Sequence, residues 1–132
     1  MSSRRTAADW RWALLVLAPL AAAAAGCASS SPIHLAHQAE QAQDYDRAVV
    51  EYTKALRENA GNREARASLE RVKQRAALDH VTRGRRFAGL ERYEEAAVEY
   101  QLASELNPTD PRVDEALKDV RQKLRTKVAV TR

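Results

Sequence analysis

Residues 44–62 read DYDRAVVEYTKALRENAGN, and this stretch decides the fold. Its small and apolar side chains recur at steps of three and four residues, which is the spacing of a single helix face. The stretch therefore predicts an amphipathic helix over about 46–58, preceded by a turn at 44–46. Gly61 predicts a left-handed stop after this helix. The inward-facing residues are Ala48, Val49, Tyr52, Ala55 and Leu56.

A second stretch, RYEEAAVEYQLASELNPTD (92–110), aligns with the first without a gap. It predicts another helix over about 93–106, ended by the break at 107–110. Corresponding residues of the two stretches are 48 positions apart. An internal repeat of this kind indicates units that stack on one another, because neither unit can bury its apolar face alone.

The segments around the repeats also have helical spacing. Pro32 suits the first turn of a helix over about 32–43. Residues 63–88 contain no proline and keep apolar residues at steps of three and four. They predict one long helix of about 26 residues, or roughly 39 Å. Asn62 is the expected cap of this helix.

The last predicted helix covers 111–126 and begins at Pro111, with Asp110 as its cap. The final residues KVAVTR (127–132) are expected to form a frayed tail. The whole pattern predicts an all-α fold of about five helices over 32–126, with one long central helix and a C-terminal capping helix. The apolar stripe of the last helix consists of Val113, Leu117, Val120 and Leu124.

The two stretches resemble the tetratricopeptide repeat family, whose unit of about 34 residues is a pair of antiparallel helices. The resemblance covers 29–62 and 77–110, and it implies that small residues let the helices approach closely while two tyrosines fill the gaps between units. The matching positions are Ala48, Tyr52 and Ala55 in the first copy, and Gly84, Phe87, Ala96, Tyr100, Ala103 and Pro108 in the second. The first copy departs from the pattern at Ala36, Ala39 and Ala60.

The copies are 48 residues apart, which is about 14 more than one family unit. Fourteen residues make about 3.9 helical turns, so an insertion of this length keeps nearly the same helix face inward. We therefore expect 63–76 to pack on the first unit as a linking helix and 77–88 to open the second. The long helix would then join the two units rigidly.

The N-terminal residues 1–26 have the pattern of a targeting segment. MSSRRTAADWRW (1–12) carries three arginines, whereas ALLVLAPLAAAAAG (13–26) carries no charge. Fourteen apolar residues fall short of the roughly 20 that span a bilayer. A basic start, a short apolar run and small residues at its end are typical of a secretory signal peptide.

Ala24-Ala25-Gly26-Cys27 resembles the lipobox of bacterial lipoproteins. The resemblance implies cleavage before Cys27, acylation of that cysteine, and a short tether over 27–31. Ala28 after the cysteine implies sorting to the outer membrane. Two other interpretations remain: ordinary signal cleavage that leaves Cys27 as a free thiol, or an uncleaved anchor.

Composition and motifs give no support for an enzymatic function, a bound cofactor or a metal site. A single cysteine excludes an internal disulfide and a multi-cysteine metal site. His34 and His37 could share a helix face, but no acidic or cysteine partner lies at a metal-ligand spacing to both. Glu94, Glu95 and Glu99 are interpreted as a solvated helix face. No phosphate-binding loop or nucleophile motif is present in the sequence.

Charge is distributed unevenly along the chain. The net charge is +4 for the whole chain and +2 without residues 1–26, which is too balanced to argue for nucleic acid. Residues 63–92 nevertheless carry nine basic and four acidic groups. Residues 93–110 carry five acidic groups and no basic one. One interpretation is ordinary solvated helix faces, and the other is a basic groove for an acidic or extended protein segment. The residues of that groove would be Lys73, Arg83, Arg85 and Arg86.

These patterns favour a binding function over catalysis. The resemblances imply a lipid-anchored scaffold or assembly factor on the periplasmic face of the bacterial outer membrane, with a protein partner. An alternative is the N-terminal lipidated repeat region of a secretin-type secretion or pilus-machinery protein. The sequence leaves the partner and the oligomeric state open.

Overall fold

The computed structural model describes residues 31–130, and within that range the chain forms five helices and no strand. The all-α array expected from the helical spacing is thereby confirmed. Cys27 and its tether residues up to 30 lie outside the described residues. The helices are α2 (Pro32–Gln41), α3 (Tyr45–Glu58), α4 (Arg63–Gly89), α5 (Tyr93–Leu106) and α6 (Pro111–Val130).

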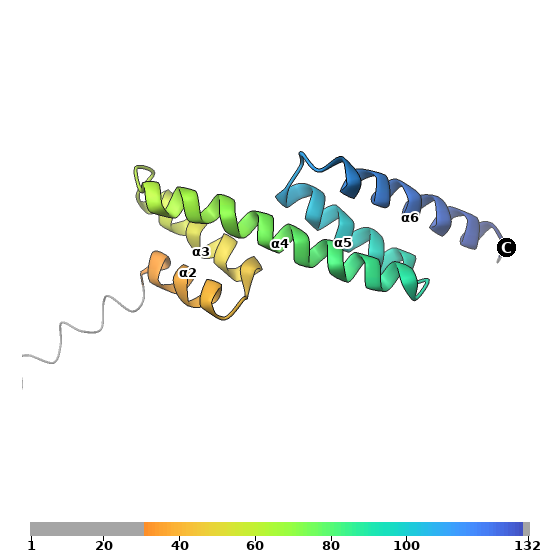
Figure 1. Ribbon diagram of the computed structural model, residues 1–132, viewed down its shortest axis with the longest axis horizontal. Helices are drawn as coiled ribbons and strands as arrows, with labels where there is room; N and C mark the ends of the chain where they lie inside the picture. Colours follow the sequence, from red (N-terminus) through yellow and green to blue (C-terminus); the bar gives the residue numbers. More distant parts are fainter. Residues whose placement is uncertain (1–30, 131–132) are drawn as a thin grey trace, which may run out of the picture.

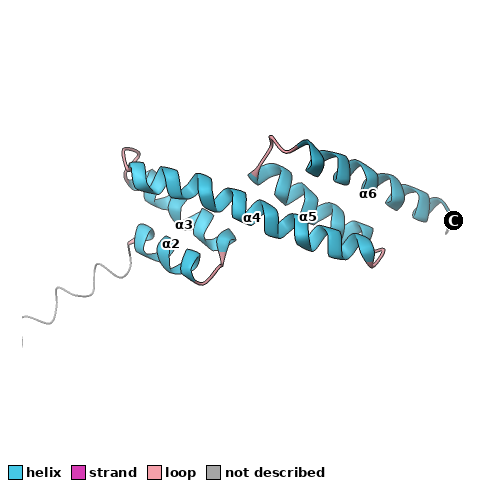
Figure 2. Cartoon of the chain, in the orientation of Figure 1, coloured by secondary structure: helices cyan, strands magenta, loops and turns pink. Residues whose placement is uncertain are grey.

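Helix α4 is the axis of the molecule (Figure 1). Helix α3 packs along the first half of α4 and α5 along its second half, while α2 packs against α3 and α6 against α5. Short loops connect the helices, so neighbours in the sequence run antiparallel (Figure 2). As a result, the start of α3 and the end of α5 both lie near the middle of α4.

The length of α4 follows from its sequence and its caps. The Asn62 side chain accepts a hydrogen bond from the Ala65 amide at 3.0 Å and so caps the N-terminus of the helix. The 27 residues that follow contain no proline, so nothing interrupts the backbone ladder. At the other end, the Leu90 amide donates to the carbonyl groups of Arg86 and Phe87.

Two small apolar cores follow one another along the length of α4. The first includes Ala36, Ala39, Ala48, Tyr52, Ala55, Ala65, Leu69 and Val72. The second includes Ala96, Tyr100, Ala103, Val113, Leu117 and Val120, with Val81, Phe87 and Ala88 against it. The first half of α4 therefore completes the first core and its second half opens the second. Alanine supplies five of the eight buried residues of the first core, which lets its helices pack closely.

The repeat is visible in the backbone as well as in the side chains. Gln43 and Glu91, 48 residues apart, both adopt left-handed backbone with φ of 59° and 57°. They end the first helix of each unit. The left-handed stop predicted at Gly61 is wrong, because no glycine of the described residues has positive φ. Instead, the Gly61 amide donates to the side-chain oxygen of Asn59 at 3.1 Å.

The end of the chain also differs from the prediction. Helix α6 continues to Val130, so residues 127–130 are helical rather than frayed. Lys127 explains the extension, because its Nζ donates to the carbonyl of Glu91 at 3.1 Å. The same ammonium lies 5.5 Å from the centre of the Tyr93 ring. These contacts hold the end of α6 against the start of α5.

Candidate functional site

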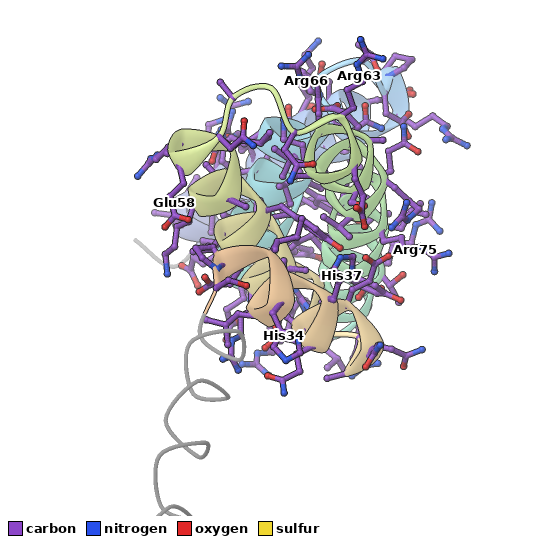
Figure 3. The ribbon with its side chains drawn as sticks, turned by 90° about the vertical axis from the view of Figure 1, so that its left-hand side faces the viewer. His34, His37, Glu58, Arg63, Arg66 and Arg75 are labelled. Carbon is purple, nitrogen blue, oxygen red and sulfur yellow. The ribbon has the colours of Figure 1, made fainter. Side chains whose placement is uncertain are left out.

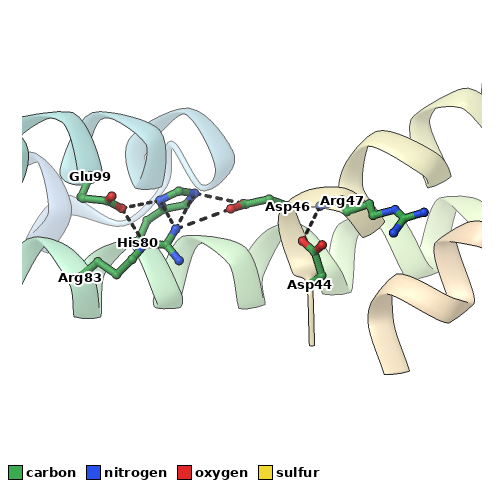
Figure 4. Close-up of polar contacts among 6 residues, drawn as sticks. All are labelled: Asp44, Asp46, Arg47, His80, Arg83 and Glu99. Atoms are coloured by element: carbon green, nitrogen blue, oxygen red, sulfur yellow. Dashed lines mark hydrogen bonds and ion pairs between the residues drawn. The ribbon is translucent and has the colours of Figure 1, made fainter. Parts of the chain in front are cut away.

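A polar cluster lies where the two units meet, and its side chains come from three helices (Figure 4). Nδ1 of His80 lies 2.7 Å from Oε2 of Glu99, and its Nε2 lies 3.1 Å from Oδ1 of Asp46. Nε of Arg83 donates to the same Glu99 oxygen at 2.9 Å. Because Asp46 belongs to α3, Glu99 to α5 and the two basic residues to α4, the cluster connects both units.

His80 and Glu99 of the cluster are largely shielded from solvent, and this changes their electrostatics. His80 is only 5% exposed. Burial raises the pKa of Glu99, but hydrogen bonds from His80 and Arg83 outweigh burial and bring the pKa below its usual value. The hydrogen bond to Glu99 raises the pKa of Arg83. The cluster is suited to holding the units together, and it leaves the Arg83 charge neutralised by carboxylates.

Glu99 therefore does not lie on a solvated face, and that prediction is wrong. The repeat carried a signal for this, because a Glu-Tyr pair recurs at 51–52 and 99–100. Glu51 is also buried, at 7% exposure, and accepts a hydrogen bond from Lys54 at 2.8 Å. Glu94 is exposed and Glu95 pairs with Arg92.

A cleft between α4 and α6, which we call the α4–α6 cleft, is the second feature of this half. Its volume is about 220 Å³. The buried ring of Tyr100 lies at its base, where Gly84 gives the ring room: a Cβ at position 84 would lie 2.9 Å from Tyr100 Cε1. The other lining residues are Leu78, Val81, Thr82, Arg85, Asp110, Arg112, Val113 and Ala116.

The two arginines of the α4–α6 cleft differ in their partners. The Arg112 guanidinium pairs with Asp110 at 2.9 Å and keeps the pKa of that carboxyl below its usual value. Arg85 is exposed and forms no ion pair with any residue of 31–130. The cleft thus combines aliphatic walls with one exposed cation that forms no ion pair, although its charge helps to lower the pKa of Asp110. This arrangement accommodates an apolar group next to a carboxylate.

The four cations predicted to form one basic groove do not lie together. Arg83 belongs to the polar cluster, and Lys73 lies 3.4 Å from Glu70, one turn away on the same helix. Arg85 lines the α4–α6 cleft, whereas Arg86 is exposed in the last turn of α4. Successive helical residues point about 100° apart, so this run of cations spreads around α4.

The predicted repeat positions occupy the interfaces between helices. Ala48, Tyr52, Ala55, Gly84, Ala96, Tyr100 and Ala103 are buried. Phe87 is partly buried, with the Arg92 guanidinium 4.7 Å from its ring centre. Pro108 is exposed in the turn before α6. Gly84 of α4 faces Tyr100 of α5, whereas the alanines share a helix with the tyrosine of their own unit.

The histidines of α2 have separate surroundings, as the end-on view shows (Figure 3). His37 lies between α2 and α4, 3.1 Å from the Tyr52 hydroxyl and 3.3 Å from Glu64. His34 is exposed on the outer side of α2. Residues 31–130 contain no group of three or more histidine, cysteine or acidic side chains placed to hold a metal ion.

None of the helices in 31–130 combines the length and apolar character needed to cross a bilayer. Comparison of the chain with protein-family models gave no match, and comparisons with curated proteins and with solved structures gave none either.

Proposed function

We propose that the chain is a membrane-anchored scaffold that binds a protein partner in the α4–α6 cleft. The observation that carries the proposal is Arg85, an exposed cation that forms no ion pair within residues 31–130 and lines an aliphatic cleft of about 220 Å³. A segment that presents an apolar side chain next to a carboxylate would fill this cleft and neutralise Arg85. An ion pair at the edge of such a cleft contributes chiefly to specificity and to the rate of association.

The membrane anchor in this proposal is Cys27. Its support is the sequence alone: a basic start, a short apolar run and AAGC at 24–27. More than one acyl chain is needed for stable anchoring, and a triacylated cysteine meets that need. We assign the protein to the periplasmic face of the bacterial outer membrane on the same basis.

The tetratricopeptide assignment is also part of this proposal. It is supported by two helix pairs with buried alanines and a buried tyrosine at matching positions, by a repeat of 48 positions, and by left-handed residues at equivalent sites. In such arrays the rigid stacking of helices provides an extended surface for a partner.

The partner is tested by photo-crosslinking in cells with benzoylphenylalanine at position 78, which lines the cleft. We expect a discrete crosslinked product that R85E reduces several-fold, because the reversed charge repels an acidic segment. R86E is the matched control, since it makes the same charge change outside the cleft. The same product from a crosslinker at Lys118, or equal loss in both variants, would contradict binding in the cleft.

The anchor is tested separately by labelling cells with radioactive palmitate. The label should enter the full chain and be lost in C27S. Retention of the label in C27S would show that Cys27 is not the acylated residue. If the full chain took up no palmitate label but still gave the crosslinked product, the anchor would be contradicted and the binding proposal would stand.

A further inference from the structure

Helix α5 presents an apolar stripe on its outer side. Val98 is 59% exposed and Leu102 is 38% exposed, and Leu106 follows at the same step of four residues. Residues at this spacing lie one above another on a helix. None of the three belongs to either apolar core, so the folding of residues 31–130 does not account for them.

This stripe leads into a groove at the meeting point of the two units, which we call the junction groove. Its walls are Val49 of α3 with Leu102 and Leu106 of α5, and His80 lies at its base. Its volume is about 360 Å³. The groove exists because the start of α3 and the end of α5 meet over the middle of α4 (Figures 1 and 4).

The edge of the junction groove is acidic. Asp46 and Glu105 both line it. The Asp46 side chain is 55% exposed, so its contacts with His80 and Arg83 leave part of it open to solvent. Glu105 accepts a hydrogen bond from the neutral Gln101 side chain and pairs with no cation of the described residues.

We propose that the junction groove binds a basic amphipathic helix of a partner protein. Its apolar residues would lie along Val98, Leu102 and Leu106, and its lysines or arginines would face Asp46 and Glu105. From Val98 to Leu106 the stripe spans about 12 Å, a little over two turns, so anchors at i, i+4 and i+7 of the partner fit it.

Charge complementarity selects this occupant over a second copy of the same surface. Two junction grooves facing each other would bring like carboxylates together, which costs free energy. A neutral apolar segment would bury the stripe but leave the acidic edge without partners. A basic helix satisfies both parts of the surface. The proposal does not rest on the α4–α6 cleft, with which the junction groove shares no lining residue.

The test uses the full chain and a fluorescein-labelled peptide of 14 leucine and lysine residues arranged as an amphipathic helix, followed by fluorescence anisotropy. We expect saturable binding that weakens as salt is added, because part of the attraction is between exposed charges. The same peptide with glutamate in place of lysine should not bind. Equal binding of the two peptides, or no binding of the lysine peptide, would overturn the proposal.

Variants locate the site. L102K should weaken binding of the lysine peptide about tenfold, equivalent to about 1.4 kcal/mol. V98K, at a more exposed position, provides a second test that does not rely on one substitution. L78K makes the same change at a residue 61% exposed in the α4–α6 cleft and should leave binding unchanged. A loss in L78K or R85E without a loss in L102K and V98K would place the peptide elsewhere and overturn the proposal.

Discussion

Nε2 of His80 lies 3.1 Å from Oδ1 of Asp46, and this contact joins the middle of α4 to the start of α3. On its other side the same imidazole faces Glu99 of α5. One buried ring thus bridges α3 and α5, and Arg83 bridges the same two helices through Glu99 and Asp46. The junction between the units depends on this ring, and so does the shape of the junction groove.

We expect H80A to lower the free energy of unfolding by about 1–3 kcal/mol, because it removes hydrogen bonds from buried groups. H37A is the matched control. His37 also lies beside a carboxylate, Glu64, but its side chain is 41% exposed, so the expected loss is below about 1 kcal/mol. Urea denaturation of both variants measures the difference. Equal losses would show that His80 does not hold the junction.

Acid should weaken the fold through Glu99 and Glu40. Burial raises the pKa of Glu40, but hydrogen bonds from Arg71 and Tyr52 outweigh it and lower the pKa below the usual 4.5. Glu99 is lowered in the same way by His80 and Arg83. A carboxyl whose pKa is lower in the folded state stabilises the fold above its unfolded pKa, and this stabilisation is lost as pH falls through the folded pKa.

Titration of these two groups should therefore leave the urea midpoint unchanged between about pH 7 and 5. At pH values under about 4.5 it should lower the urea midpoint. In E99Q the fall should be smaller, because the titrating group is gone, although the variant is less stable at neutral pH. E94Q, on the exposed side of α5, should retain the fall of the unmodified chain. An unchanged acid dependence in E99Q would contradict the role of its carboxylate.

Gly84 should not tolerate a side chain. A Cβ there would lie 2.9 Å from Tyr100 Cε1, and the Tyr100 ring is only 4% exposed, so it has little room to move. Overpacking of this kind costs about 1–3 kcal/mol, which exceeds the gain of about 1 kcal/mol from alanine in a helix. We expect G84A to lower the thermal midpoint.

G89A is the matched control in the same helix, because a Cβ at position 89 meets nothing within 4 Å. Its thermal midpoint should be unchanged or slightly raised. If G84A were as stable as G89A, the close approach of Tyr100 to α4 would not be a constraint on this position.

The elements of the fold could be predicted because their signals are local. Helix α5 has the bounds expected from its sequence, and α3 begins one residue earlier than expected. Apolar spacing and the capping residues Asn62 and Asp44 lie within a few positions of the helices they define. The end of α6 was not predictable in this way, because Lys127 is held by Glu91, 36 residues earlier.

The candidate sites depend on contacts between distant parts of the chain. His80 is 34 residues from Asp46 and 19 from Glu99, and neither separation has a sequence signature. The run of cations on α4 indicated a basic surface, but the pairing of Arg83 with Glu99 removes one of its charges. Only the folded arrangement distinguishes that arginine from Arg85, two residues away.

Glycine at positions 43 and 91 should stabilise the protein. Gln43 and Glu91 have φ of 59° and 57°, a conformation that costs a residue with a Cβ about 1–2 kcal/mol and costs glycine almost nothing. Part of this gain is offset because glycine also gives the unfolded chain more freedom. We expect Q43G and E91G each to raise the free energy of unfolding by about 0.5–1 kcal/mol, with A42G as the control. Ala42 has φ of −78°, so glycine there relieves no strain and should lower stability.

Because positions 43 and 91 lie in different units and share no contact partner, the double variant should gain the sum of the two effects. A loss of stability in both single variants, measured by urea denaturation, would show that the left-handed turns are not strained.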